Sequence, residues 1–191
     1  GEQMAEAKGF KVESRVLLPP VDTAPLRAEG GDFNEVYMRL CAHNRLKPNS
    51  TVLCLFPNQT HTHTIHSVDI SLRASSAYLG LKGTLVFAQM LRHCPNLETL
   101  NLRNLNLTNK ELAALLQIIA GHGRLMALDI SGNKASIGAS KALVKAVHTT
   151  ATLGEVVMEN TGIPVAFERA VRKQLAGQGR NCNGTAHQSR A

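Results

Sequence analysis

The sequence predicts an α/β fold in which strand–helix units repeat and stack into a short solenoid. The pattern L-x-x-L-x-L occurs at 97–102 and again at 125–130, and related segments with Ile, Val or Met at some of these positions occur at 65–70 and 153–158. These four segments start 32, 28 and 28 residues apart. Such spacing is at or near the top of the range for short strand–helix repeats, about 20–29 residues. A helical pattern of apolar residues follows each segment after a turn, which gives every unit its second element.

A fifth and weaker copy of the strand pattern lies at 50–55, only 15 residues before the next copy. This spacing leaves no room for a helix between the two. The expected number of units is therefore four to five.

The helical half of the unit is clearest after the strand at 97–102. Thr108 and Glu111 have the spacing of a capping box, in which the hydroxyl and the carboxylate satisfy free amides at the start of a helix. Apolar residues then follow at helical spacing on one face: Leu112, Leu115, Leu116 and Ile119. Similar patterns predict helices at 84–93, 137–147 and 164–176.

The two ends of a stack need elements that cover its exposed apolar faces. Residues 33–46 are predicted to form an N-terminal capping helix and 164–176 a C-terminal one, which sets the repeat domain at 33–176. Residues 1–32, with three prolines, are expected to form an extended arm, and 177–191 a flexible basic tail.

The turn after each strand offers a further match to a repeat. Asn58 and Asn133 lie eight residues after the first position of their units, where a turn asparagine is typical, whereas Asn104 comes one place early and Arg73 and Thr161 replace it elsewhere. By these motifs, residues 50–175 resemble the leucine-rich repeats of the ribonuclease-inhibitor type. The resemblance implies a horseshoe with parallel strands on its concave side and helices on its convex side. An ordinary doubly wound sheet of βα units is the alternative.

The short repeat domain is also similar to the C-terminal domain of tropomodulin and to leucine-rich proteins of flagellate protists. Those resemblances imply a partner in the cytoskeleton or in a flagellum. They transfer no individual residue to this chain.

Composition sets limits on the class of protein. Hydrophobic residues make up 43% of the 191 residues, but only 4% are aromatic and there is no Trp, so the core must be aliphatic. Apolar runs are far shorter than the ~20 residues of a membrane span, so no membrane partner is expected. The four cysteines have no CxxC pairing, which disfavours a disulfide framework and favours a reducing, cytoplasmic setting.

Side chains alternate along a strand, so the residues between the leucines are predicted to face the concave side. This side is expected to carry a net charge of −3, although the whole chain has a formal charge of +7. Such a surface suits a protein partner, since a phosphate backbone needs positive charge. Solvated strand positions without a binding role are the alternative. The residues expected to contact a partner are Asp69, Ser71, Asn101, Arg103, Asp129, Ser131 and Glu159.

Positive charge gathers near the C-terminus instead. Arg169, Arg172 and Lys173 share one helical face and could contact an acidic partner, or could simply keep the terminal helix solvated. Among the histidines, His61 and His63 could lie on one side of a strand, but no cysteine or carboxylate ligand is near in sequence, so no metal site is expected.

Neither a nucleophile elbow nor a phosphate loop is recognisable in the sequence. We therefore expect no enzymatic activity, no cofactor and no small-molecule substrate. The leading hypothesis is a non-catalytic protein–protein interaction module, a structural or adaptor subunit of an intracellular assembly. The alternative is a peripheral subunit of a ribonucleoprotein such as a ribosome, with RNA bound by the basic arm and tail.

Overall fold

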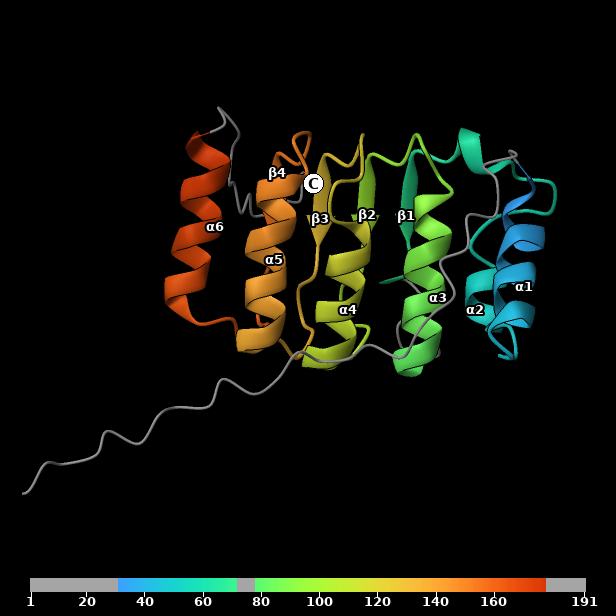
Figure 1. The fold of residues 1–191 in the computed structure, drawn as a ribbon, viewed down its shortest axis with the longest axis horizontal. Coiled ribbons are helices and arrows are strands. Elements are labelled where there is room, and N and C mark those ends of the chain that lie inside the picture. Colours follow the sequence, from blue (N-terminus) through green and yellow to red (C-terminus); the bar gives the residue numbers. More distant parts are fainter. Residues whose placement is uncertain (1–30, 72–77, 178–191) are drawn as a thin grey trace, which may run out of the picture.

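The computed structural model describes residues 31–71 and 78–177, which form one four-stranded parallel sheet and six α-helices (Figure 1). The predicted α/β class is therefore confirmed. The predicted arm, residues 1–32, and the predicted tail, residues 177–191, lie almost wholly outside the described residues. None of the described helices is long and apolar enough to cross a membrane.

The strands are short and follow one another across the sheet in chain order, β1 to β4. The middle residues of the four strands pair in register: Val68 with Leu100, Leu100 with Leu128, and Leu128 with Val156. Each middle residue is buried, while both of its neighbours face outward. This alternation is what the repeated motif predicts. The bounds are Ser67–Asp69 for β1, Thr99–Asn101 for β2, Ala127–Asp129 for β3 and Glu155–Val157 for β4.

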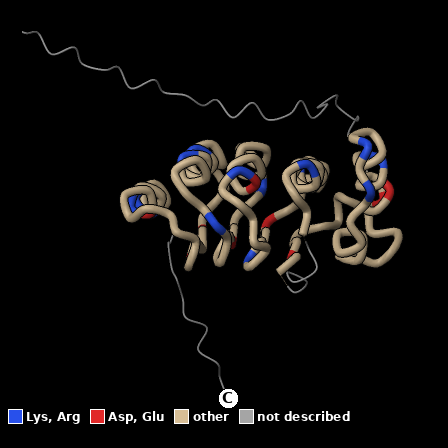
Figure 2. The backbone as a smooth tube through the Cα atoms, turned by 90° about the horizontal axis from the view of Figure 1, so that it is seen from below, with Lys and Arg blue, Asp and Glu red and all other residues tan. Residues whose placement is uncertain are grey.

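Four helices, α3 to α6, lie in one layer on one side of this sheet (Figures 1 and 2). The predicted capping box is present at the start of α4, where Thr108 and Glu111 exchange hydrogen bonds. The helix predicted at 84–93 begins four residues earlier, at Gly80, whose positive φ suits glycine. The bounds are Gly80–Arg92 for α3, Asn109–Ile119 for α4, Ile137–Thr149 for α5 and Val165–Gly177 for α6.

The N-terminal end differs from the prediction at one element. The predicted capping helix is present as α1, at Phe33–His43. The prediction of a strand at 50–55 is wrong, because Ser50–Leu53 form a short helix, α2. Asn49 caps this helix by accepting a hydrogen bond from the Thr51 amide at 2.8 Å, which favours helical over extended backbone. The sheet therefore has four strands.

The side chains expected on the concave side from that missing strand have other roles. Val52 is completely buried. Phe56 packs edge-on against Phe33, with 4.9 Å between the ring centroids. Cys54 is exposed, but it caps the C-terminal end of α2 and belongs to no strand.

The two predicted turn asparagines behave differently. Asn133 is buried and bonded to four backbone groups of two neighbouring units. Asn58 is exposed, and its side-chain oxygen accepts a hydrogen bond from the Asn34 side-chain amide at 3.4 Å. In the last unit Thr161 takes the place of Asn133, because its hydroxyl donates to the carbonyl three residues earlier, as the Asn133 amide does. The equivalent position in the first unit, Arg73, lies outside the described residues.

Candidate binding face

The side of the sheet opposite the helices is the candidate site, and we call it the strand face. The residues flanking the buried middle positions form two aligned rows across the four strands. The first row is Ser67, Thr99, Ala127 and Glu155; the second is Asp69, Asn101, Asp129 and Val157. A third row follows the strands at Ser71, Arg103, Ser131 and Glu159.

Neighbouring strands are linked within these rows by side-chain hydrogen bonds. The Thr99 hydroxyl donates to the Ser67 hydroxyl oxygen at 2.6 Å. The Asn101 amide donates to a carboxylate oxygen of Asp69 at 3.1 Å. The part of the face on β1 and β2 is therefore held in a fixed arrangement before any partner binds.

The second row also ends the strands. The Oδ1 atoms of Asp69, Asn101 and Asp129 accept hydrogen bonds from backbone amides two residues later, at 2.9, 3.0 and 2.8 Å. This is an Asx turn, in which the side chain stands in for a backbone turn. Val157 cannot make it in the last unit. Asparagine and aspartate form the turn equally well here, so the aspartate charge can be removed without removing the turn.

One predicted contact residue is not available on this face. Ser131 is only 2% exposed, and its hydroxyl oxygen accepts a hydrogen bond from the Glu159 amide at 3.1 Å. Its hydroxyl joins two units in the structure, so we leave Ser131 out of the exposed residues of the strand face. By contrast, Asp69, Arg103 and Glu159 are exposed, while the other predicted residues of the face, Ser71, Asn101 and Asp129, are half-buried.

Charge separates across the molecule. The three rows carry Asp69, Asp129, Glu155 and Glu159 against a single cation, Arg103. The six helices carry nine Lys and Arg residues against three Glu residues. Figure 2 shows Lys and Arg along the helical layer. The electrostatic potential is therefore negative over the strand face and positive over the helices.

The histidine segment does not form a strand. Residues Thr62–Thr64 form a 3-10 turn, and the rings of His61 and His63 stack with 5.4 Å between their centroids. His66 instead pairs with Glu98 at 3.3 Å across the start of β1 and β2. Within 31–71 and 78–177, no group of three or more His, Cys, Asp or Glu side chains is arranged to hold a metal ion.

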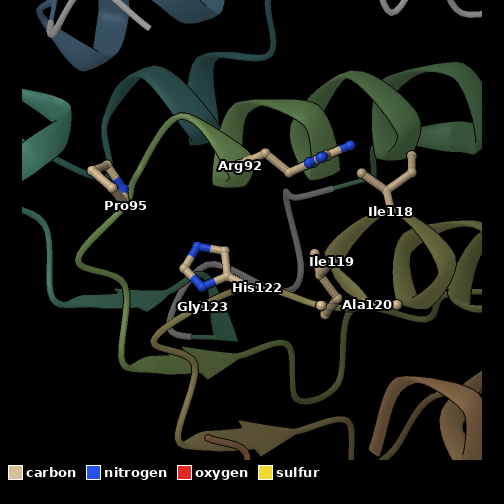
Figure 3. A pocket seen from close by; sticks show the side chains of 8 residues that line it. Arg92, Pro95, Ile118, Ile119, Ala120, His122 and Gly123 are labelled. Atoms are coloured by element: carbon tan, nitrogen blue, oxygen red, sulfur yellow. The ribbon is translucent and has the colours of Figure 1, made fainter. Parts of the chain in front are cut away.

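A cavity of about 300 Å³ opens at the C-terminal ends of α3 and α4 (Figure 3). Its titratable lining groups are Arg92 and His122, and the His122 ring lies with Nε2 3.1 Å from the Cys94 carbonyl oxygen. Burial lowers the pKa of His122 below its ordinary value, and the Arg92 charge adds to this effect. Burial and Arg92 lower the pKa of His93 in the same way.

These two histidines predict a pH-dependent stability. A histidine with a lowered pKa in the folded state takes up fewer protons than it does when unfolded. Its contribution to stability is therefore complete above about pH 6.5 and falls as the pH drops from there toward the lower folded-state pKa. We expect the free energy of unfolding in urea to be smaller at about pH 5.5 than at about pH 7.5. A His93→Gln/His122→Gln variant should show a flatter dependence. If the free energy of unfolding of that variant depends on pH as strongly as that of the unmodified chain, groups other than these two histidines cause the dependence.

The buried thiols are unsuited to nucleophilic chemistry. Burial raises the pKa of Cys94 to about 12 and raises that of Cys41. Both thiols therefore stay protonated at neutral pH, and a thiol is a far weaker nucleophile than a thiolate. Burial also raises the pKa of Tyr37, whose phenol oxygen accepts a hydrogen bond from the Asn49 amide at 3.3 Å.

Comparison with known proteins found no matching family model, no matching curated protein and no matching solved structure. The functional conclusion therefore depends on the geometry of this chain.

Proposed function

We propose that the chain is a short leucine-rich-repeat solenoid of four units that binds another protein through its strand face. The repeat assignment is supported by strands that recur every 28–32 residues and pair in identical register. It is also supported by the Asx turn that recurs after three of the four strands. Each unit places one strand and one helix on opposite sides, as a stack of such repeats requires.

The observation that carries the binding function is the acidic strand face on a rigid sheet. Its second row is held by backbone and side-chain hydrogen bonds, so little conformational freedom is lost when a partner docks. Its excess of carboxylates favours a basic partner surface. The module is non-catalytic in this proposal, an adaptor or structural subunit in the cytoplasm, the cytoskeleton or a flagellum.

The ribonucleoprotein alternative relied on the basic arm and tail. Residues 1–30 of that arm and 178–191 of that tail lie outside the described residues. The strand face itself gives that alternative no support, because its carboxylates repel phosphate.

The proposal predicts that neutralising two carboxylates of the second row weakens capture of a partner protein. We expect an Asp69→Asn/Asp129→Asn variant to bind about tenfold more weakly, since each interfacial charge contact contributes on the order of 0.5–1 kcal/mol. The measurement is affinity capture from a cell extract, followed by titration of the captured protein. Both substitutions keep the Asx turn, as Asn101 shows. Asp69→Asn also removes the oxygen that accepts from the Asn101 amide, so urea unfolding of the variant is measured beside its affinity.

The matched control removes the same charge elsewhere. Glu35 and Glu168 lie on α1 and α6, away from the strand face. A Glu35→Gln/Glu168→Gln variant should bind like the unmodified chain. If the unmodified chain and the two double variants bind the partner with equal affinity, the strand face is not part of the interface.

A further inference from the structure

The helices α4, α5 and α6 carry an outward-facing group of cations, which we call the basic layer. Lys141 and Lys145 lie one turn apart on α5, opposite its buried residues, and both are exposed. Arg169 and Lys173 are placed in the same way on α6, and Lys110 points outward from α4. Arg172 flanks the group on α6.

Acidic residues are few on the described helices that carry this layer. The three helices contain only two acidic residues, Glu111 and Glu168. Glu111 is 5% exposed and is bound to Thr108 in the capping box. Glu168 is half-buried near the start of α6. The potential over the outer surface of α4 to α6 is therefore positive.

The layer also lacks the anchors that protein partners use. The exposed large hydrophobic residues of α5 and α6 are Ile137 and Val165, the first residue of each helix. The outward positions between the cations include Ala166, Ala170 and Ala176. Protein interfaces concentrate aromatic and other large side chains at their centre and are depleted in lysine and alanine.

We propose that the basic layer binds the phosphate backbone of a double-stranded nucleic acid. Lysine and arginine suit contacts to phosphates, which need positive charge alone. Binding of single strands commonly adds exposed aromatic side chains on which bases stack, whereas Phe167 of α6 packs against the core. Packed helices lie about 8–10 Å apart, so three helices span roughly 20 Å. A duplex carries one phosphate charge per ~1.7 Å of its axis, so this span faces enough phosphates for the five cations other than Arg172.

The test is fluorescence anisotropy of the full chain with labelled duplexes of RNA and of DNA, titrated at several salt concentrations. If the five cations other than Arg172 engage, the affinity should fall with salt with a logarithmic slope of up to about −4.5. A Lys141→Gln/Lys145→Gln/Lys173→Gln variant should reduce that slope by about 2.7 and bind at least tenfold more weakly at low salt. The duplex that binds more tightly identifies the source of the phosphate backbone.

A matched control keeps the same net charge as that variant. Lys47, Lys82 and Lys134 are exposed and lie outside α4, α5 and α6. Their replacement by Gln should therefore leave most of the salt dependence of duplex affinity unchanged. Equal losses in the two triple variants would overturn the proposal, since net charge alone would then explain binding. Binding of poly-glutamate with no binding of either duplex would also overturn it and would indicate an acidic protein partner. The Asp69→Asn/Asp129→Asn variant should not weaken duplex binding, which separates this test from that of the strand face.

Discussion

Replacing Asn133 by Ala is expected to destabilise the protein by about 3–5 kcal/mol. The Asn133 amide donates to the carbonyls of Leu102 and Ile130 at 2.8 and 2.9 Å, and its oxygen accepts from the Leu107 amide at 2.9 Å. The substitution leaves these buried backbone groups without a partner, at a cost of about 1–3 kcal/mol each. Because the bonds join two units, the loss should be seen in the single cooperative transition of urea unfolding.

The matched control is Asn58→Ala. Asn58 was predicted to hold the same place in its unit, but it is exposed. Its replacement should change the free energy of unfolding by less than about 1 kcal/mol, as exposed substitutions usually do. Similar losses in the two variants would contradict the assignment of Asn133 as the asparagine that joins two turns.

Replacing Leu128 by Ala is expected to cost about 3 kcal/mol, within the range of 2–5 kcal/mol for core leucines. Leu128 is the middle residue of β3, is 1% exposed and pairs in register with Leu100 and Val156. The cavity would open at the centre of the stack, where neighbours on both sides limit collapse. Thermal and urea unfolding measure the effect.

Met126 provides the comparison from the same segment. It lies two residues before Leu128, just outside the strand, and is 54% exposed. Met126→Ala should cost less than about 1 kcal/mol. An equal cost at the two positions would show that Leu128 does not face the core.

Much of the fold could be predicted from the sequence, because burial imposes a regular spacing. The motifs at 97–102 and 125–130 place a buried leucine at the centre of each strand, as in the structure at Leu100 and Leu128. The prediction at 50–55 was wrong because a short apolar segment fits a helix as well as a strand. The Asn49 side chain caps the first turn and so favours the helix over the strand. Such a cap can be recognised in a sequence only when the start of the helix is already known.

The candidate site could be predicted in part. Alternation along each strand correctly places Asp69, Asn101 and Asp129 beside one another. It could not show that Ser131 accepts a hydrogen bond from the next unit, since that bond joins residues 28 apart. Hydrogen bonds between units depend on the exact stacking of strands, which the spacing of leucines does not determine.

The basic layer was predicted only at its C-terminal part. Arg169, Arg172 and Lys173 were recognised because they are close in sequence. Lys110, Lys141 and Lys145 were missed because they join that group only when three helices pack side by side. Comparing the charge of the outward positions of each predicted helix would have identified them.

The most direct test of the strand face as the binding surface is hydrogen–deuterium exchange of the chain with and without its captured protein partner. We predict slower exchange in peptides that cover β1 to β4 and the turns at Ser71, Arg103 and Glu159, with little change in the peptides of α4 to α6. Slower exchange confined to α4, α5 and α6, with the strand peptides unchanged, would contradict the proposed function.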